Sequence, residues 1–129
     1  MDKKFFVPFG TAKQLRKKGY NEKISYAYNK GRRIVRAGVI DCNNTDWDNL
    51  RKVQSSYPPR LDYIAAPTYH EVVDWLWKKG KFIFAEYRAY ENDWAGFIGE
   101  INGEMKYLTE FPTREEALNV GILKALEML

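Results

Sequence analysis

The chain has 129 residues, 45% hydrophobic and 29% charged, which is enough for one substantial core and too little for two large ones. A single cysteine, Cys42, and a single histidine, His70, exclude an internal disulfide and argue against most zinc sites and Cys/His nucleophile pairs. The apolar run from Phe5 to Phe9 is broken by Pro8 and is too short for a secretory signal or a membrane span, so we expect a cytoplasmic protein.

The first third of the chain predicts a basic helix and a hairpin. Residues 11–18 form a short helical pattern led by Thr11, and Gly19 follows where a left-handed residue closes a helix. Residues 24–28 alternate in polarity, and a similar run resumes at residue 32 after turn-forming residues, which is typical of a β-hairpin.

Charge is concentrated in this first third. Residues 1–36 hold eleven Lys/Arg against two acids, a net charge of +9, whereas the rest holds ten against fifteen, a net charge of −5. Two interpretations stay open: a solvated face balanced by the acidic remainder, or a surface for a polyanion such as nucleic acid. The candidate polyanion-binding residues are Lys13, Arg16, Lys17, Lys18, Arg32, Arg33 and Arg36.

Residues 41–59 predict a loop or hinge. A short helix carrying Trp47 and Leu50 is compatible with the pattern, but Pro58 and Pro59 force extended backbone soon after it.

From Thr68 the pattern predicts the order helix, strand, strand, strand, helix. Thr68 with Glu71 and Thr113 with Glu116 have the spacing of capping boxes, in which each side chain satisfies a backbone N–H of the helix start. Three β-branched and aromatic runs lie between the two helices, at residues 82–90, 94–101 and 105–111, divided by turn residues that include Asn102-Gly103. The expected fold class is α+β: a three-stranded antiparallel meander with flanking helices, plus an N-terminal helix and hairpin. We expect a single domain, residues 1–129, with a basic subregion at 1–59 and the αβββα core at 60–129.

Apolar side chains in excess of one core predict self-association, most simply a dimer. Small residues at 117, 121 and 125 of the final helix predict close approach to the sheet, while Val120, Leu123 and Leu126 lie outside that stripe. Trp75 lies off the expected core face of its helix, so we expect it to be an exposed contact residue.

The sheet is expected to carry aromatic residues on the face away from the helices, among them Phe82, Phe84 and Tyr90. Such a face stacks nucleobases in single-strand binders, or it seats the N-terminal hairpin or another subunit. We favour packing of the hairpin or of another subunit over nucleobase stacking.

No catalytic or metal-binding motif stands out, and no cofactor is expected. Glu86, Glu100 and Glu110 lie on successive strands, where a metal or acid/base cluster competes with ordinary cross-strand ion pairs, and ion pairs are favoured. His70 has no adjacent thiol or acid arranged as a triad, so a surface imidazole is expected.

Three segments resemble small uncharacterised proteins carried by phages and mobile elements of gut Bacteroidetes: FFVPFGTAKQLRKKGYNEK, IAAPTYHEVVDWLWKKGKF and TREEALNVGILKALEML. The resemblance implies a bacterial or phage origin. The C-terminal order of elements is similar to that of the double-stranded RNA-binding domain, whose phosphate contacts come from lysines at the start of its last helix. Here that position holds Arg114, Glu115 and Glu116, which places carboxylates where phosphate would lie. The resemblance therefore implies the topology and not RNA binding by this surface.

We therefore expect a small intracellular binding or interaction protein that is not an enzyme. The alternative is nucleic-acid binding through the basic N-terminal region, and an unknown protein partner and no membrane contact are expected.

Overall fold

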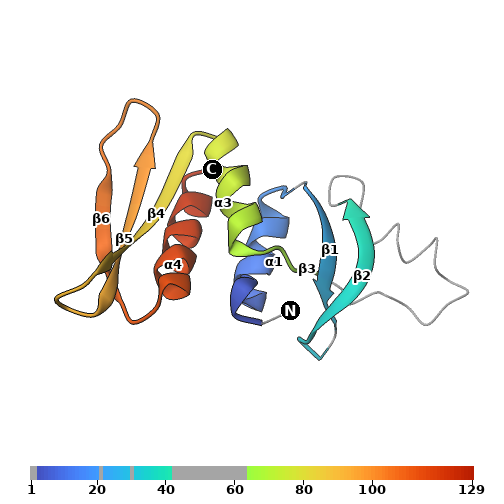
Figure 1. Cartoon of the computed structure of the whole chain (residues 1–129). Coiled ribbons are helices and arrows are strands. Elements are labelled where there is room, and N and C mark those ends of the chain that lie inside the picture. The colour runs from blue at the N-terminus through green and yellow to red at the C-terminus, as the bar shows by residue number, and fades with distance from the viewer. Residues whose placement is uncertain (1–2, 21, 30, 42–63) are drawn as a thin grey trace, which may run out of the picture. The chain divides into compact units, whose positions relative to one another are not determined.

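The computed structural model has the α+β fold that the sequence predicts, and it describes residues 3–20, 22–29, 31–41 and 64–129 (Figure 1). The described elements in chain order are η1 (Lys3–Phe5), α1 (Phe9–Lys17), β1 (Lys23–Tyr28), β2 (Ile34–Asp41), β3 (Ile64–Ala65), α3 (Tyr69–Lys78), β4 (Lys81–Arg88), β5 (Asp93–Glu100), β6 (Lys106–Phe111) and α4 (Arg114–Glu127). Cys42, Trp47, Leu50 and the Pro58-Pro59 pair lie outside the described residues, so the expectations for the loop or hinge stay predictions.

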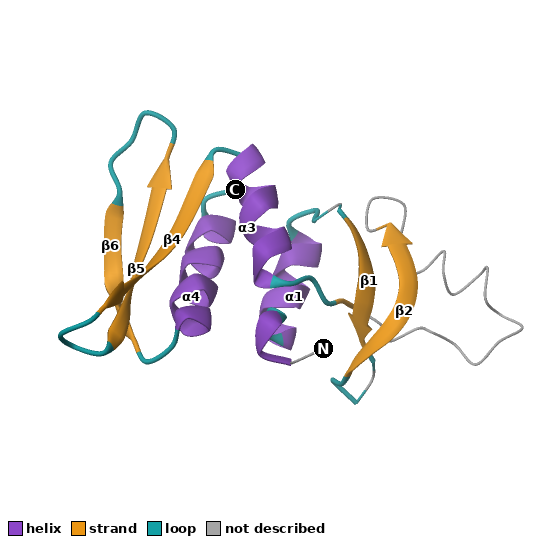
Figure 2. Ribbon diagram, viewed as in Figure 1, coloured by secondary structure: helices purple, strands orange, loops and turns teal. Residues whose placement is uncertain are grey.

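The chain divides into two compact units. Unit 1 comprises Met1–Val7 together with Thr68–Leu129, and unit 2 comprises Pro8–Pro67. Each contains one three-stranded antiparallel sheet, in the order β2-β1-β3 in unit 2 and β4-β5-β6 in unit 1 (Figure 2). The division separates charge as well, because unit 2 holds twelve Lys/Arg against five acids, and unit 1 holds nine against twelve.

Unit 2 contains the predicted hairpin and one strand that the sequence did not suggest. β1 and β2 pair antiparallel, and the two-residue strand β3 pairs with the other edge of β1. The turn depends on Asn29, whose side-chain oxygen accepts the Arg33 N–H at 3.0 Å. Arg32 takes the left-handed conformation here, with φ of 58°, instead of the neighbouring Gly31.

The N-terminal helix is also predicted, but its start is two residues earlier than expected. It begins at Phe9 after Pro8, which has extended backbone and makes no side-chain cap. Thr11 therefore lies within the helix and is buried, so the expected start of the helix at Thr11 is wrong. Gly19 has φ of 83° and closes the helix as predicted.

In unit 1 the predicted αβββα order is confirmed. The Thr68 side chain accepts the Glu71 N–H at 3.2 Å, and the Glu71 carboxylate accepts the Thr68 N–H at 2.9 Å, so this capping box is complete. At α4 the Thr113 hydroxyl accepts the Glu116 N–H at 3.2 Å. Both helices therefore begin where the sequence places them. An isolated antiparallel bridge between Phe6 and Thr68 ties the N-terminal segment of unit 1 to the start of α3.

The three strands form a regular meander with tight turns. Left-handed residues sit at both turns, Asn92 with φ of 53° and Asn102 with φ of 61°. Asn tolerates this region better than most side chains do, which explains its place between the strands. Opposite the junction of Gly96 and Phe97 the register shifts by a bulge in β6.

Helix α4 packs closely on one face of this sheet, as its small residues predict (Figure 1). A Cβ atom placed on Gly121 would lie 2.6 Å from Cγ2 of Ile83, so only glycine permits this approach. Ile83, Ile98, Leu118 and Ile122 are buried in the resulting core. In β4 the odd-numbered residues, among them Ile83 and Ala85, thus lie on the face toward the helices, and the even-numbered residues lie on the opposite face.

Gly121→Ala is expected to destabilise the protein by roughly 1–2 kcal/mol, because overpacking against Ile83 outweighs the gain in helix propensity. The midpoint of urea unfolding measures the change. Gly10→Ala in α1 is the matched control, since nothing lies within 4 Å of a Cβ there, and it should be neutral or slightly stabilising. Equal effects of the two substitutions would contradict the close contact.

Candidate functional site

The face of the unit 1 sheet that turns away from α4 carries a row of aromatic side chains. Phe84 on β4 pairs with Phe97 on β5, and Phe97 pairs with Tyr107 on β6. The Phe97 and Tyr107 rings are 5.7 Å apart at 54°. Because partners in register share a face, the three rings cross the whole width of the sheet.

Trp77, from the last turn of α3, extends this row at the β4 edge. Its ring packs edge-on against Phe82 at 4.6 Å and against Phe84 at 5.9 Å. We call Trp77, Phe82, Phe84, Phe97 and Tyr107 the aromatic row.

The aromatic row is unusually open to solvent. Trp77 is 51% exposed, Phe84 43% and Tyr107 51%, and Met105 beside them is 46% exposed. With about 100 Å² for each half-exposed side chain, these four present roughly 400 Å² of apolar surface. A patch of this size matches the largest apolar patch of a typical monomer, and such patches are often functional sites.

Room for Met105 on this face depends on Gly99. The Met105 sulfur lies where a Cβ of residue 99 would be, so a side chain there would displace the methionine. Gly99 thus allows close packing between β5 and the Met105 side chain.

The other end of the same face is charged. Arg88 pairs with Asp93 through two hydrogen bonds, Nε to Oδ1 at 2.7 Å and Nη2 to Oδ2 at 2.9 Å, and its Nη1 lies 3.6 Å from Glu110. The bond from Arg88 lowers the pKa of Asp93 and raises that of Arg88. A hydrogen bond between Tyr107 and Glu110 raises the pKa of the tyrosine and lowers that of the glutamate, which links the charged end to the aromatic row.

The three strand glutamates do not form one cluster. Glu100 belongs to the helix-facing register and pairs with Lys81 at 3.0 Å, while Glu110 approaches Arg88. The structure therefore shows cross-strand ion pairs at these two positions. Among the residues that the structure describes, no group of three or more His, Cys, Asp or Glu could hold a metal ion.

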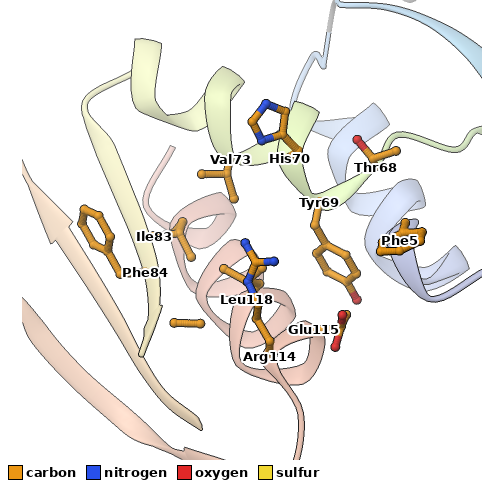
Figure 3. Close-up of a pocket in the computed structure, with 11 residues that line it drawn as sticks. Phe5, Thr68, Tyr69, His70, Val73, Ile83, Phe84, Arg114, Glu115 and Leu118 are labelled. Carbon is orange, nitrogen blue, oxygen red and sulfur yellow. The ribbon is translucent and has the colours of Figure 1, made fainter. Parts of the chain in front are cut away.

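A pocket of about 570 Å³ opens between the N-terminal turns of α3 and α4 and the strand β4 (Figure 3). Val73, Ile83 and Leu118 give it apolar walls, and Arg114 and Glu115 lie at the start of α4. Its size suits a small molecule, but the adjacent opposite charges select neither an anion nor a cation. His70 at its rim is 87% exposed in its side chain and lies 3.5 Å from Asp74, which fits the predicted surface imidazole.

Trp75 is buried, at 2% exposure, so its predicted role as an exposed contact residue is wrong. The buried stripe of α3 is Tyr69, Val72, Trp75 and Leu76, because residues three and four positions after Val72 share its face. Among the tryptophans that the structure describes, the exposed one is Trp77, at 51%. Its signal in the sequence was the cluster of Trp77, Phe82 and Phe84 around the tight turn at Gly80.

The apolar residues of α4 that were predicted to form an interface are only partly available for contact with another molecule. Leu126 is buried at 2% exposure, which contradicts its predicted place on an interface. Val120 and Leu123 are half-buried and stay candidates for an interface. The broad apolar surface of α4 is thus used largely for the core, because the helix packs against both the sheet and α3.

All seven candidate polyanion-binding residues lie in unit 2 and are exposed. Two of them meet at one ring: the Lys13 Nζ lies 5.7 Å from the centre of the Phe9 ring, and the Arg32 Cζ lies 4.8 Å from it. The helix and the hairpin therefore bring at least two cations together. The other five, Arg16, Lys17, Lys18, Arg33 and Arg36, stay predicted members of such a surface.

Comparison with known proteins identifies no relative: no family model, no curated protein and no solved structure matches this chain. Within the described ranges, no helix is long and apolar enough to cross a membrane.

Asp93→Asn should lower the melting temperature near pH 7 and have progressively less effect below about pH 4. The reason is that Arg88 lowers the pKa of folded Asp93, so the stabilisation is present above the unfolded pKa and is lost as pH falls through the folded one. Thermal unfolding of both proteins from pH 7 to pH 2 measures the difference. A difference that is constant with pH would show that the ion pair is not its source.

Proposed function

We propose that this protein is a small, non-enzymatic binding protein of a bacterial cell that contacts its partner through the aromatic row of unit 1. The observation that carries the proposal is the half-exposed line of Trp77, Phe84 and Tyr107 across the sheet. Large aromatic side chains are enriched at the centres of interfaces and dominate their binding energy.

The size of the patch indicates a reversible contact. Burial of roughly 400 Å² of apolar surface at about 25 cal/mol per Å² gives about 10 kcal/mol before any costs. Lost translational and rotational freedom alone costs about 4–15 kcal/mol, so a modest affinity remains. This favours a transient partner over a permanent assembly.

We favour binding over catalysis for the pocket beside His70 as well. A hydrolytic or transfer site needs a nucleophile, a base and an anion hole together, and the residues that line this pocket do not supply that set. Binding is therefore the better proposal than catalysis.

Self-association, most simply as a dimer, and an origin on a phage or mobile element belong to the same proposal. Half-buried Val120 and Leu123 support the first, and the sequence resemblance supports the second. The genes that neighbour this one are the direct test of the origin.

Photo-crosslinking tests the contact surface. With p-benzoylphenylalanine at position 107, irradiation of cells that carry the gene is expected to yield a discrete crosslinked product, which Trp77→Ala should diminish. The matched control is the same group at position 90, since Tyr90 is fully exposed in the β4–β5 turn and lies outside the aromatic row. A product of twice the chain mass would identify a second copy, and a heavier one a different protein. Equal products from both positions, or none from position 107, would contradict the proposal.

A second candidate function is polyanion binding by unit 2. The observation that favours it is the meeting of Lys13 and Arg32 at the Phe9 ring, in a unit with a net charge of +7. Clustered cations bind nucleic acid by releasing counterions condensed on the phosphates.

Arg32→Glu with Arg33→Glu should abolish binding to a DNA duplex at low salt. Wild-type binding should be independent of sequence and should fall steeply as salt increases, which fluorescence anisotropy measures. Lys106→Glu with Lys124→Glu makes the same charge change in unit 1 and should leave binding intact. No wild-type binding even at low salt, or equal loss in both double variants, would remove this function.

A further inference from the structure

We propose that the aromatic row and the carboxylates beside it form one docking surface for a polypeptide segment in which apolar anchors alternate with lysine or arginine. The inference rests on the proposed function and adds the chemistry of the partner. It depends on the division of one sheet face into an apolar end and an acidic end.

The apolar end sets the shape of the occupant. Its roughly 400 Å² of apolar surface is close to the apolar part of the ~800 Å² that each partner contributes to a standard interface, so area alone does not choose between a chain segment and a second subunit. The rings lie in one line across the sheet, from Trp77 to Tyr107, and a single segment of chain can follow such a line.

The acidic end sets the charge of the occupant. Glu86, Asp93 and Glu110 outnumber Arg88 on this face, and Arg88 is already bonded to Asp93 and near Glu110. Glu86 is exposed, and its carboxylate makes no ion pair within the described part of the chain. Cations on the occupant complete this surface.

The same charges disfavour the two main competitors. Two copies joined face to face would bury their excess carboxylates either against each other or against the partner's aromatic row, and both arrangements cost energy at an interface. Single-stranded nucleic acid could stack on the rings, but its phosphates need free cations in the groove, and Arg88, the cation that the described residues place on this face, is engaged.

The two ends are continuous. A hollow lined by Phe84, Phe97, Met105 and Glu86 runs from the aromatic row to the first carboxylate. Positions 84 and 86 are two residues apart on one strand, and 82 and 86 are four apart, or about 7 and 13 Å. An occupant in extended form therefore places its cation two to four residues from its apolar anchor, and a helical one places it one or two turns away.

Three fluorescent peptides test this chemistry with the full chain. One repeats Leu-Ser-Lys-Ser, which sets leucine and lysine on one side of an extended strand; the others replace lysine with glutamate or leucine with glycine. The Leu/Lys peptide is expected to bind about tenfold more tightly than either of the others, as measured by anisotropy. Added salt should weaken its binding without abolishing it, because the apolar anchors are not screened.

Variants of the protein assign the binding to each end of the face. Trp77→Ala should weaken Leu/Lys binding by about tenfold, and Glu86→Lys by about fivefold. Glu127→Lys is the matched control for charge, because it lies exposed on α4, which packs on the opposite face of the sheet, and it should change nothing. Phe84→Ser is a second probe of the apolar end, and circular dichroism confirms that each variant is folded.

Several results would overturn the inference. Equal binding of the glutamate peptide would show that no cation is required, while the proposed function would stand. If the glycine peptide bound as tightly as the Leu/Lys peptide and Trp77→Ala did not weaken it, the binding would depend on charge alone and the aromatic row would have no part in it. Binding of oligothymidine that Trp77→Ala abolishes would assign the row to nucleic acid. No peptide binding at millimolar concentration would also refute the inference, and crosslinking from position 107 then decides the proposed function separately.

Discussion

The close contact of α4 with β4 at Gly121 and Ile83 determines how unit 1 is built. A helix that approaches a sheet without an intervening side chain buries small residues along its length, here at positions 117, 121 and 125. One face of a three-stranded sheet is then fully used by helices. The other face has no helix of unit 1 to cover it, and the strand period of two puts Phe84 and Phe97 there.

An exposed aromatic face would ordinarily be an aggregation hazard, and this sheet contains features that limit the hazard. The β6 edge is interrupted by a bulge, which twists an edge strand and hinders pairing with another chain. Trp77 covers part of the β4 edge by packing on Phe82 and Phe84. The charged end of the face, with Arg88 held by Asp93, adds like-charge repulsion between copies.

Local signals in the sequence were sufficient for the order of helices and strands from Thr68 onward. The order of elements followed from capping at Thr68 and Thr113 and from turn chemistry at Asn102, because each of these acts within four residues. The close approach at Gly121 followed from the spacing of small residues. Burial of Trp75 did not follow, because Val73 and Trp75 lie on opposite sides of the stripe that contains Tyr69, Val72 and Leu76, and helical periodicity alone does not decide which side faces the core.

The remaining features depend on contacts that are distant in sequence. Strand β3 has two residues, too few for a periodic pattern, and it exists only because β1 offers a free edge to it. The aromatic row was predicted only at Phe82 and Phe84. Its extension to Tyr107 required the register across β5 and β6, and its extension to Trp77 required the direction in which α3 ends. Cross-strand ion pairs of the strand glutamates were expected, and Glu110 does approach Arg88, but the pairing of Arg88 with Asp93 across a turn was not foreseen.

The bridge between Phe6 and Thr68 has a consequence for biosynthesis. Unit 1 is discontinuous in sequence, so its first segment leaves the ribosome well before the residues against which it packs. Unit 2, continuous from Pro8 to Pro67, is complete in the nascent chain before α3 emerges. The basic unit is therefore the first that can fold on the ribosome, and the aromatic face of unit 1 is assembled only after synthesis reaches the C-terminal helix.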